Sequence, residues 1–171
     1  ISPDPQNEYF SDGITEEIIN ALAGIPGLRV TSRTSSFFFK GHSAPLREIA
    51  LQLGVETILT GSVRLAGDLV RITAQLIQTS DDFHLWSQTW DRRLENIFAI
   101  QDEISLLIAE KLREQFGHFE IRDHLVEKST DNLDAYSLAL KASYYFNKWN
   151  PVDVRTAIEL YEKAIALDPS Y

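Results

Sequence analysis

The chain has 171 residues and a formal net charge of −9, with four His and neither Cys nor Met. Its length and its 44% content of hydrophobic residues suit one ordinary globular domain or two small ones with a sizeable core. The lack of Cys excludes disulfide frameworks, zinc fingers and thiol catalysis, no apolar run approaches the ~20 residues of a membrane span, and the acidic balance argues against nucleic acid.

The first third of the chain is predicted to form two helices separated by a short strand and a loop. Apolar residues at three- and four-residue spacing predict a helix over about Asp12 to Ala23. Alternation of apolar and polar residues predicts a strand at Leu28–Ser32, and Arg33–Gly41 is predicted to be a loop. A second helix is predicted to follow, with Ser43 as its N-cap and Gly54 at its end.

The central part of the chain predicts a β-meander. The period changes to two at Thr57–Leu65, and Gly67-Asp68 is a good hairpin turn. Val70–Leu76 alternates apolar with polar residues, which is typical of a half-buried strand. A third strand is predicted at Phe83–Arg92, with Trp86 and Trp90 on one face.

The rest of the chain is predicted to be helical. A long helix is expected over Asn96–Phe116, followed by a helical extension or linker. Two further helices are predicted at Asp134–Phe146 and Val152–Leu167, with a break at Asn150-Pro151. These elements predict an α/β domain over residues 1–120, a linker or helix extension over 121–131 and a helix pair over 132–171.

The final helix resembles the second helix of a tetratricopeptide repeat. Ala157, Tyr161, Ala164 and Pro169 have the spacing of that pattern, in which small residues let two helices approach and an aromatic fills the groove between them. The first helix of such a repeat would contain Tyr136, Ala139 and Leu140. The turn between the helices is longer than usual, and the Trp and Gly of the first helix are missing. Since one repeat cannot bury both its faces, the resemblance implies an array that continues beyond Tyr171.

The first 120 residues are similar to a bacterial α/β domain that commonly precedes tetratricopeptide repeats. Five stretches carry this resemblance: NEYFSDGITEEII (7–19), RTSSF (33–37), GSVR (61–64), VRITAQLI (70–77) and IFAIQDEI (97–104). The resemblance implies a fold like the N-terminal domain of the Tol-system propeller protein. It also implies a parent that carries a class III adenylate/guanylate cyclase, a winged-helix regulator or a Ser/Thr kinase.

The same resemblance implies a mixed sheet with the order β-α-β-α-β-β-β-α, followed by the tetratricopeptide-like hairpin. The family has an apolar strand upstream of Ile1, so most of the first strand is expected to be missing. A chain that begins at Ile1 and contains no Met is accordingly predicted to be a piece of a longer protein. A sheet position left open in this way is expected to be filled by a neighbouring chain, which predicts a homodimer.

Catalysis and metal binding find little support in the sequence. The adjacent carboxylates Glu16-Glu17, Asp81-Asp82 and Asp102-Glu103 have ordinary roles in helix first turns and in loops. His118 and His124 are six residues apart, which places them on opposite faces of a helix, and no known metal motif occurs. We therefore expect no catalytic, cofactor-binding or metal-binding residues in this chain.

Two groups of residues are candidates for ligand or partner binding. Arg33, Ser35, Ser36 and Lys40 combine hydroxyls and cations after a predicted strand, which is where open α/β sheets bind anions. The alternative is that the hydroxyls only stabilise a tight loop. Trp86, Trp149 and Tyr161 are the aromatic candidates for partner contact, and the alternative is core packing.

The sequence therefore predicts a non-catalytic sensory or protein-interaction region of a bacterial signalling protein. A protein or peptide is expected to bind the helical surface, without nucleic acid and without membrane insertion by this region. A small-ligand or anion sensor centred on Arg33–Lys40 is the alternative. The resemblance implies a parent with a transmembrane helix upstream, so the region is expected to be the periplasmic or extracytoplasmic part of a membrane-anchored protein; a cytoplasmic location is the alternative.

Overall fold

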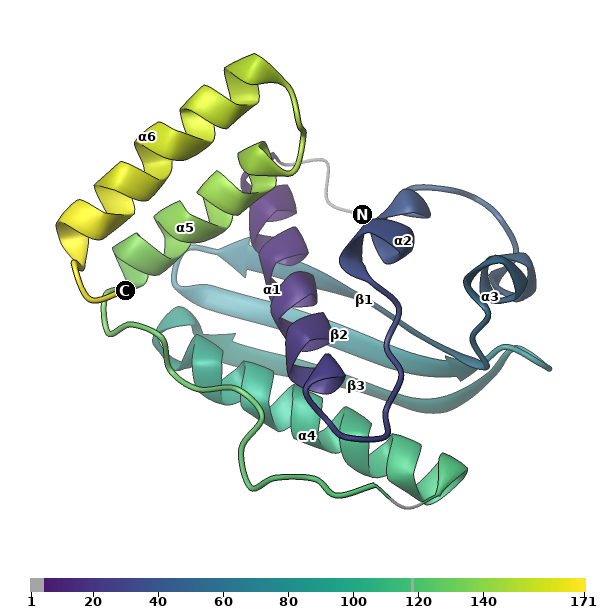
Figure 1. Cartoon of the computed structure of the whole chain (residues 1–171). Helices are drawn as coiled ribbons and strands as arrows, with labels where there is room; N and C mark the ends of the chain where they lie inside the picture. The colour runs from purple at the N-terminus through teal and green to yellow at the C-terminus, as the bar shows by residue number, and fades with distance from the viewer. Residues whose placement is uncertain (1–4, 118) are drawn as a thin grey trace.

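The computed structural model describes residues 5–117 and 119–171 (Figure 1). Its elements follow in the order α1 (Pro5–Ala23), α2 (Arg33–Phe38), α3 (Leu46–Leu53), β1 (Thr57–Ala66), β2 (Leu69–Gln78), β3 (Phe83–Arg93), a 3-10 turn η1 (Leu94–Asn96), α4 (Ile97–Phe116), α5 (Leu133–Phe146) and α6 (Pro151–Leu167). The fold is mixed α/β, as predicted. The sheet differs from the prediction, because within the described residues it is a three-stranded antiparallel meander and not a mixed sheet.

The meander follows from the alternation of residues in β2, its central strand. Val70, Ile72, Ala74 and Leu76 point to one face and are at most 6% exposed, whereas the residues between them point to the polar outer face. Gly67 has a φ of 64° in the turn that pairs β1 with β2, a conformation that favours glycine. The predicted meander is confirmed in all three strands.

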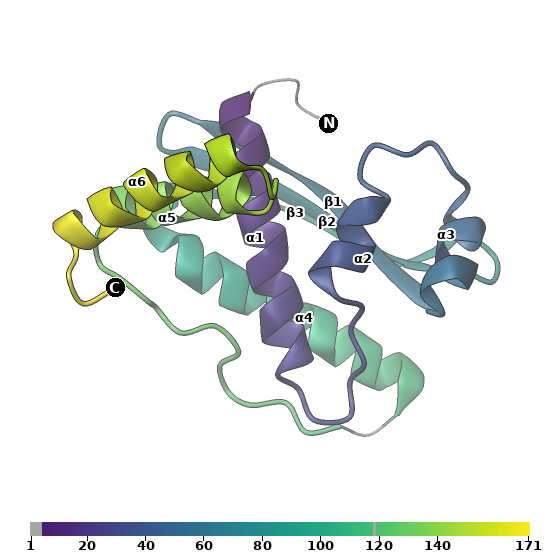
Figure 2. The same ribbon diagram turned by 45° about the horizontal axis from the view of Figure 1, so that its top comes forward.

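Helices α1 and α4 cover the apolar face of the sheet (Figures 1 and 2). The core between these layers is dense with Ile, since helical spacing in both helices directs one face inward. The largest fully buried side chains of this core include Trp90, Phe10, Ile14, Leu76, Ile97, Ile100, Ile104 and Ile108. Burial of each such side chain contributes roughly 1.5–3 kcal/mol, which makes this layer the main source of stability.

The segment before the meander differs from the prediction in three ways. The first helix begins at Pro5 and not near Asp12, because Pro is favoured at the first helical position. Leu28–Ser32 is extended but lies outside the sheet, so the predicted strand is wrong. Arg33–Phe38 is not a loop but the short helix α2, for which Ser32 is the N-cap and accepts a hydrogen bond from the Ser35 amide.

The helix after Ser43 is confirmed as α3, with its end at Gly54 in the left-handed conformation. Its N-cap is Pro45 and not Ser43. The C-terminal helices are also confirmed, and each begins at an Asn that accepts hydrogen bonds from backbone amides of the first turn. Asn132 caps α5 in this way and Asn150 caps α6. Residues between α4 and α5 form a linker without helix in its described part.

Helices α5 and α6 form an antiparallel hairpin that packs against the α/β part of the fold through α5 and α1 (Figure 2). The contact is close at Gly13 of α1, where an added Cβ would lie 2.6 Å from Leu140 Cδ2. Helix α5 lies between α1 and α6, so α6 forms the outer layer of the molecule at that end. The hairpin is therefore docked on α1, so the mixed α/β layers and the hairpin share an interface.

Candidate functional site

Three polar side chains, one half-buried and two fully buried, meet where the hairpin docks on the α/β layers. Glu17 comes from α1, Gln101 from α4 and Tyr136 from α5. The Tyr136 hydroxyl donates to Glu17 Oε2 over 2.7 Å, and Gln101 Nε2 donates to the Tyr136 hydroxyl oxygen over 2.9 Å and also to Glu17 Oε2. We call these residues the docking network, since they join three helices from distant parts of the chain.

Two of the three side chains in the docking network are shielded from water. Gln101 and Tyr136 are both 0% exposed. Burial raises the pKa of Glu17, although the hydrogen bonds from Tyr136 and Gln101 act in the opposite direction. Burial also raises the pKa of Tyr136, and the neighbouring Glu17 carboxylate adds to this rise. The network therefore holds an acid whose charged form is disfavoured by its surroundings.

Two polar atoms beside the network have no hydrogen-bond partner within the described residues. They are Gln101 Oε1 and Ser105 Oγ, and both are buried. Ser105 lies four residues after Gln101 in α4, so the two side chains share one face of that helix. Buried polar atoms are rarely left unpaired, because each one costs roughly 1–3 kcal/mol. The pattern of hydrogen bonds around Gln101 is thus incomplete.

The docking network was not predicted from the sequence. Glu16 and Glu17 were expected in the first turn of a helix, whereas α1 starts at Pro5 and both residues lie well inside it. One signal was present, because Glu17 lies three residues after Ile14 and therefore beside the buried stripe of α1. The partner Tyr136 was predicted only as part of the first repeat helix. The hydrogen bond between Tyr136 and Glu17 joins residues 119 positions apart in the sequence, and no local sequence pattern predicts it.

The basic residues of the predicted anion site are already paired with carboxylates. Lys40 Nζ donates to both oxygens of Asp12, at 2.6 and 2.8 Å, and to Glu8 Oε1 at 2.8 Å. Arg33 Nε donates to Glu16 Oε2 at 2.9 Å, and the guanidinium lies 4.2 Å from the centroid of the Phe37 ring. Both cations thus join α2 and the turn after it to α1 through charged hydrogen bonds.

The hydroxyls of that site also serve local structure. The Ser32 hydroxyl bonds to the Ser35 hydroxyl at 3.1 Å and caps α2, on which Ser36 is half-buried. Helix α2, described throughout its length, has no buried residue and spans only six positions. With Arg33 and Lys40 neutralised by α1, the geometry adds no support to an anion site, and anion binding stays a prediction.

The two strand tryptophans face the core side of the sheet. Trp90 is 1% exposed and donates from Nε1 to Glu103 Oε1 over 2.9 Å, while Trp86 is half-buried, with its ring 5.6 Å from that of Trp90. The Trp90 ring belongs to the main core cluster, and the Trp86 ring packs against that cluster. The core-packing alternative therefore describes Trp86 better than an open binding platform.

The aromatic candidates on the hairpin are exposed. Trp149 is 73% exposed in the turn between α5 and α6, with a φ of 54° that is uncommon for a bulky residue, and its ring lies 5.1 Å from that of Phe146. Tyr161 on α6 is 38% exposed. No hydrogen bond or ring contact joins either residue to Arg33 or Lys40 within the described residues.

One carboxylate of α4 binds backbone amides of the linker, whose apolar side chains also pack against the core. Asp102 is 9% exposed, and its Oδ1 accepts from the amides of Leu125 at 2.6 Å and Val126 at 2.9 Å. Its Oδ2 lies 2.7 Å from Nδ1 of the exposed His124. His118 lies outside the described residues, and the described part of the chain contains no group of three acidic or His side chains suited to a metal ion.

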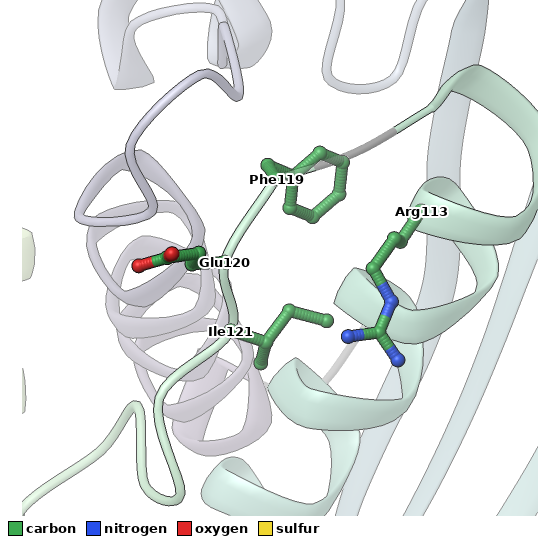
Figure 3. A pocket seen from close by; sticks show the side chains of 4 residues that line it. All are labelled: Arg113, Phe119, Glu120 and Ile121. Carbon is green, nitrogen blue, oxygen red and sulfur yellow. The ribbon is translucent and has the colours of Figure 1, made fainter.

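An open pocket of about 720 Å³ lies between the end of α4 and the start of the linker (Figure 3). It is lined by Arg113 from α4 and by Phe119, Glu120 and Ile121 from the linker. Figure 3 shows Phe119, Ile121 and Arg113 pointing toward the space between the two segments, whereas Glu120 points away. The pocket has one cation and no second convergent polar group, so it does not assemble a catalytic set.

These features describe a mixed α/β unit with a docked helical hairpin, and none of the helices in its described residues is long and apolar enough to cross a membrane. No protein-family model matches the chain. Along 99% of its length the chain is 37% identical to the protein named "Putative adenylate cyclase 3" from Rhizobium meliloti (strain 1021). The chain spans 29% of the length of that relative, so it is similar to one part of a cyclase-associated signalling protein.

Proposed function

We propose that this chain is a non-catalytic interaction region of a cyclase-linked signalling protein and that its hairpin binds a partner helix. The similarity to part of a protein named as an adenylate cyclase supports the signalling context. The exposed surface of α6 supports the mode of binding. The α/β layers would then serve as the base on which the hairpin is mounted.

The observation that carries this proposal is an apolar stripe on α6. The side of α6 that faces α5 buries the small residues Ala157 and Ala164. Next to that side, Ile158 is 52%, Tyr161 38% and Ile165 55% exposed. Positions three and seven residues apart share one helix face, so these three residues form a continuous strip, called here the apolar stripe.

A second helix is the partner whose shape and chemistry fit this stripe. An amphipathic helix recognises such a surface through apolar residues at the same three- and four-residue spacing. The resemblance of α6 to a tetratricopeptide helix favours the same occupant, since stacked helical units cover each other's faces. On the other side of the hairpin, α1 already covers α5. The hairpin therefore offers its partner the α6 side.

A synthetic peptide that copies residues 132–147, the first helix of the hairpin, tests this proposal. Stacked repeats pair a second helix with a first helix, so we expect this peptide to bind the intact chain through the apolar stripe. The double substitution Ile158→Glu and Ile165→Glu is expected to abolish binding in isothermal titration calorimetry. Leu51→Glu on α3 is the matched control, because Leu51 is an apolar residue with 76% exposure far from the hairpin.

Equal binding by the double variant and by the Leu51→Glu control would contradict the proposal. Sedimentation velocity on the same samples measures self-association. If the wild-type chain is a dimer and only the double variant is a monomer, the partner is a second copy of the chain. In the full-length parent, the double substitution is expected to change cyclic AMP output, whereas Leu51→Glu leaves it unchanged.

A further inference from the structure

Helix α1 lies between the hairpin and the α2 segment, which comprises residues 33–42 (Figures 1 and 2). Contacts between α5 and α1 recur at four-residue intervals along α5. In order along α5, they join Tyr136 to Glu17, Leu140 to Gly13 and Tyr144 to Glu8. The contact of Tyr144 lies in the last turn of α5, so it holds the part of the hairpin that carries the exposed Trp149. We call residues 144–149 the hairpin end.

Glu8 binds the α2 segment as well as the hairpin end. Its Oε1 accepts a hydrogen bond from Lys40 Nζ over 2.8 Å, and its Oε2 accepts one from the Tyr144 hydroxyl over 3.1 Å. The hydrogen bond from Lys40 is the main reason that the pKa of Glu8 is lowered, and the bond from Tyr144 acts in the same direction, although burial opposes both. One ionised carboxylate therefore joins two elements that lie 32 and 136 positions from it in the sequence.

Ion pairs with α1 supply much of the attachment of the α2 segment. Helix α2 has no buried residue, and Arg33 at its start pairs with Glu16 over 2.9 Å. In the turn after it, Lys40 binds both oxygens of Asp12 in addition to Glu8. Because Asp12 is only 8% exposed, Lys40 neutralises a carboxylate that water barely reaches. Lys40 is therefore a fixed partner for Glu8 while the segment is docked.

We propose that Glu8 couples the docking of the α2 segment to the docking of the hairpin end. With Lys40 in place, the Glu8 carboxylate is already held in the orientation that receives Tyr144, so the second hydrogen bond costs less side-chain entropy. When Lys40 leaves, Glu8 regains its rotamers and the bond to Tyr144 weakens. Each contact therefore stabilises the other, and the coupling does not depend on what the apolar stripe binds.

The charge of Lys40 has an opposing effect on the same hydrogen bond. It draws electron density in the carboxylate toward Oε1, which makes Oε2 a weaker acceptor for Tyr144. The side chains of Lys40 and Glu8 are 40% and 41% exposed, so water screens this effect. The ordering of Glu8 does not depend on screening, and it decides the sign of the coupling.

Hydrogen exchange of the hairpin end in the intact chain tests the coupling. The amides of Asn147, Lys148 and Trp149 report on it, since each is bonded to a carbonyl of the last turn of α5. In Lys40→Met we expect them to exchange about two- to fivefold faster than in the wild type, the range of a partly exposed ion pair. The Tyr136 amide, at the other end of α5, should keep its protection, which separates the coupling from a general loss of stability.

Arg33→Met is the matched control variant. It breaks the other ion pair of the α2 segment and leaves Lys40, Glu8 and Tyr144 in place. Exchange within α2 should become faster in this variant, whereas the hairpin end should keep the wild-type rate. The proposal is overturned if Arg33→Met speeds exchange of the hairpin end as much as Lys40→Met does.

Reciprocity supplies a second test that does not require the Lys40→Met variant to fold. Tyr144→Phe should speed exchange of the Lys40 and His42 amides, which are bonded within the turn after α2, by the same factor. Tyr145→Phe should leave these amides unchanged, because no hydrogen bond of its hydroxyl occurs within the described residues. Unchanged exchange in Tyr144→Phe would overturn the coupling.

The double variant isolates the link itself. In a Tyr144→Phe background, Lys40→Met should add no further change at the hairpin end, because Glu8 no longer binds the hairpin there. A full effect of Lys40→Met in that background would show that the α2 segment acts on the hairpin by another route, and it would overturn the role of Glu8.

Discussion

Gly13 on α1 lies so close to Leu140 on α5 that an added Cβ would sit 2.6 Å from Leu140 Cδ2 and 3.1 Å from Leu140 Cδ1. Real Cβ atoms do not approach a neighbour this closely, so the two helices meet where a hydrogen replaces a side chain. Leu140 is 7% exposed and has little room to move away. The docking of the hairpin therefore depends on a small residue in a helix that also covers the sheet.

Gly13→Ala is expected to destabilise the chain by about 1–3 kcal/mol, because the new methyl group overpacks the interface. In a Leu140→Ala background, the same Gly13→Ala substitution should stabilise the chain. There the clash is gone, and Ala is favoured over Gly in a helix interior by about 1 kcal/mol. Urea unfolding of the two single variants and the double variant measures this coupling. Additive effects would show that the two residues do not meet.

Tyr136→Phe is expected to lower the free energy of unfolding by about 1–2 kcal/mol at neutral pH. The ring keeps its contact with Phe98, whose centroid lies 4.8 Å away, but Glu17 loses the donor at 2.7 Å. Chemical denaturation monitored by circular dichroism gives the value. The matched control is Tyr145→Phe, since no hydrogen bond of the Tyr145 hydroxyl occurs within the described residues; its effect should stay within about 0.5 kcal/mol.

The elements with strong periodicity were predictable from the sequence. The β2 alternation, the Gly67-Asp68 turn and the long α4 helix all appear where the pattern placed them, because each buries one apolar face. Leu28–Ser32 has the same alternation but lies outside the sheet. Strand formation needs a paired neighbour as well as a pattern, and that partner is not encoded locally.

The candidate site was harder to predict, since its residues are brought together by long-range packing. Arg33 and Lys40 resembled an anion site because the carboxylates that pair with them, Glu16 and Asp12, lie on another helix. Glu17 resembled a surface charge for the same reason. By contrast, Tyr161 and Trp149 are exposed on the hairpin, and their role in partner contact stays a prediction.

Lys40→Met is expected to loosen α2 and the turn after it without unfolding the core. Lys40 links this segment to Asp12 and Glu8, beside the pair of Arg33 and Glu16, and α2 has no buried residue of its own in the described structure. Because Lys40 is partly exposed, we expect a loss of about 1–2 kcal/mol and not the full value of a buried pair.

Hydrogen exchange across residues 33–56 measures this loosening. Amides of the meander should keep their protection. Lys111→Met serves as the control, because Lys111 pairs with Glu114 on the surface of α4, far from α2. Equal exchange over residues 33–56 in both variants would mean that Lys40 does not hold the segment.

The docking of the linker on α4 is expected to depend on pH through the pair of Asp102 and His124. The hydrogen bond to Asp102 raises the pKa of His124. Burial alone would raise the pKa of Asp102, but the hydrogen bonds from His124 and from the amides of Val126 and Leu125 outweigh it, so the pKa is lowered.

The His124 contribution is fully present below the ordinary pKa of His and is lost as the pH rises through the raised value, whereas Asp102 stays ionised across that range. Exchange of the Leu125 and Val126 amides should therefore become faster at alkaline pH than intrinsic rates explain. His124→Gln should remove this excess, since Gln can still donate to Asp102 but carries no charge. Asp102→Asn should expose both amides at every pH, because the charged acceptor that binds them is gone. An alkaline excess that persists in His124→Gln would show that the imidazolium does not stabilise the linker.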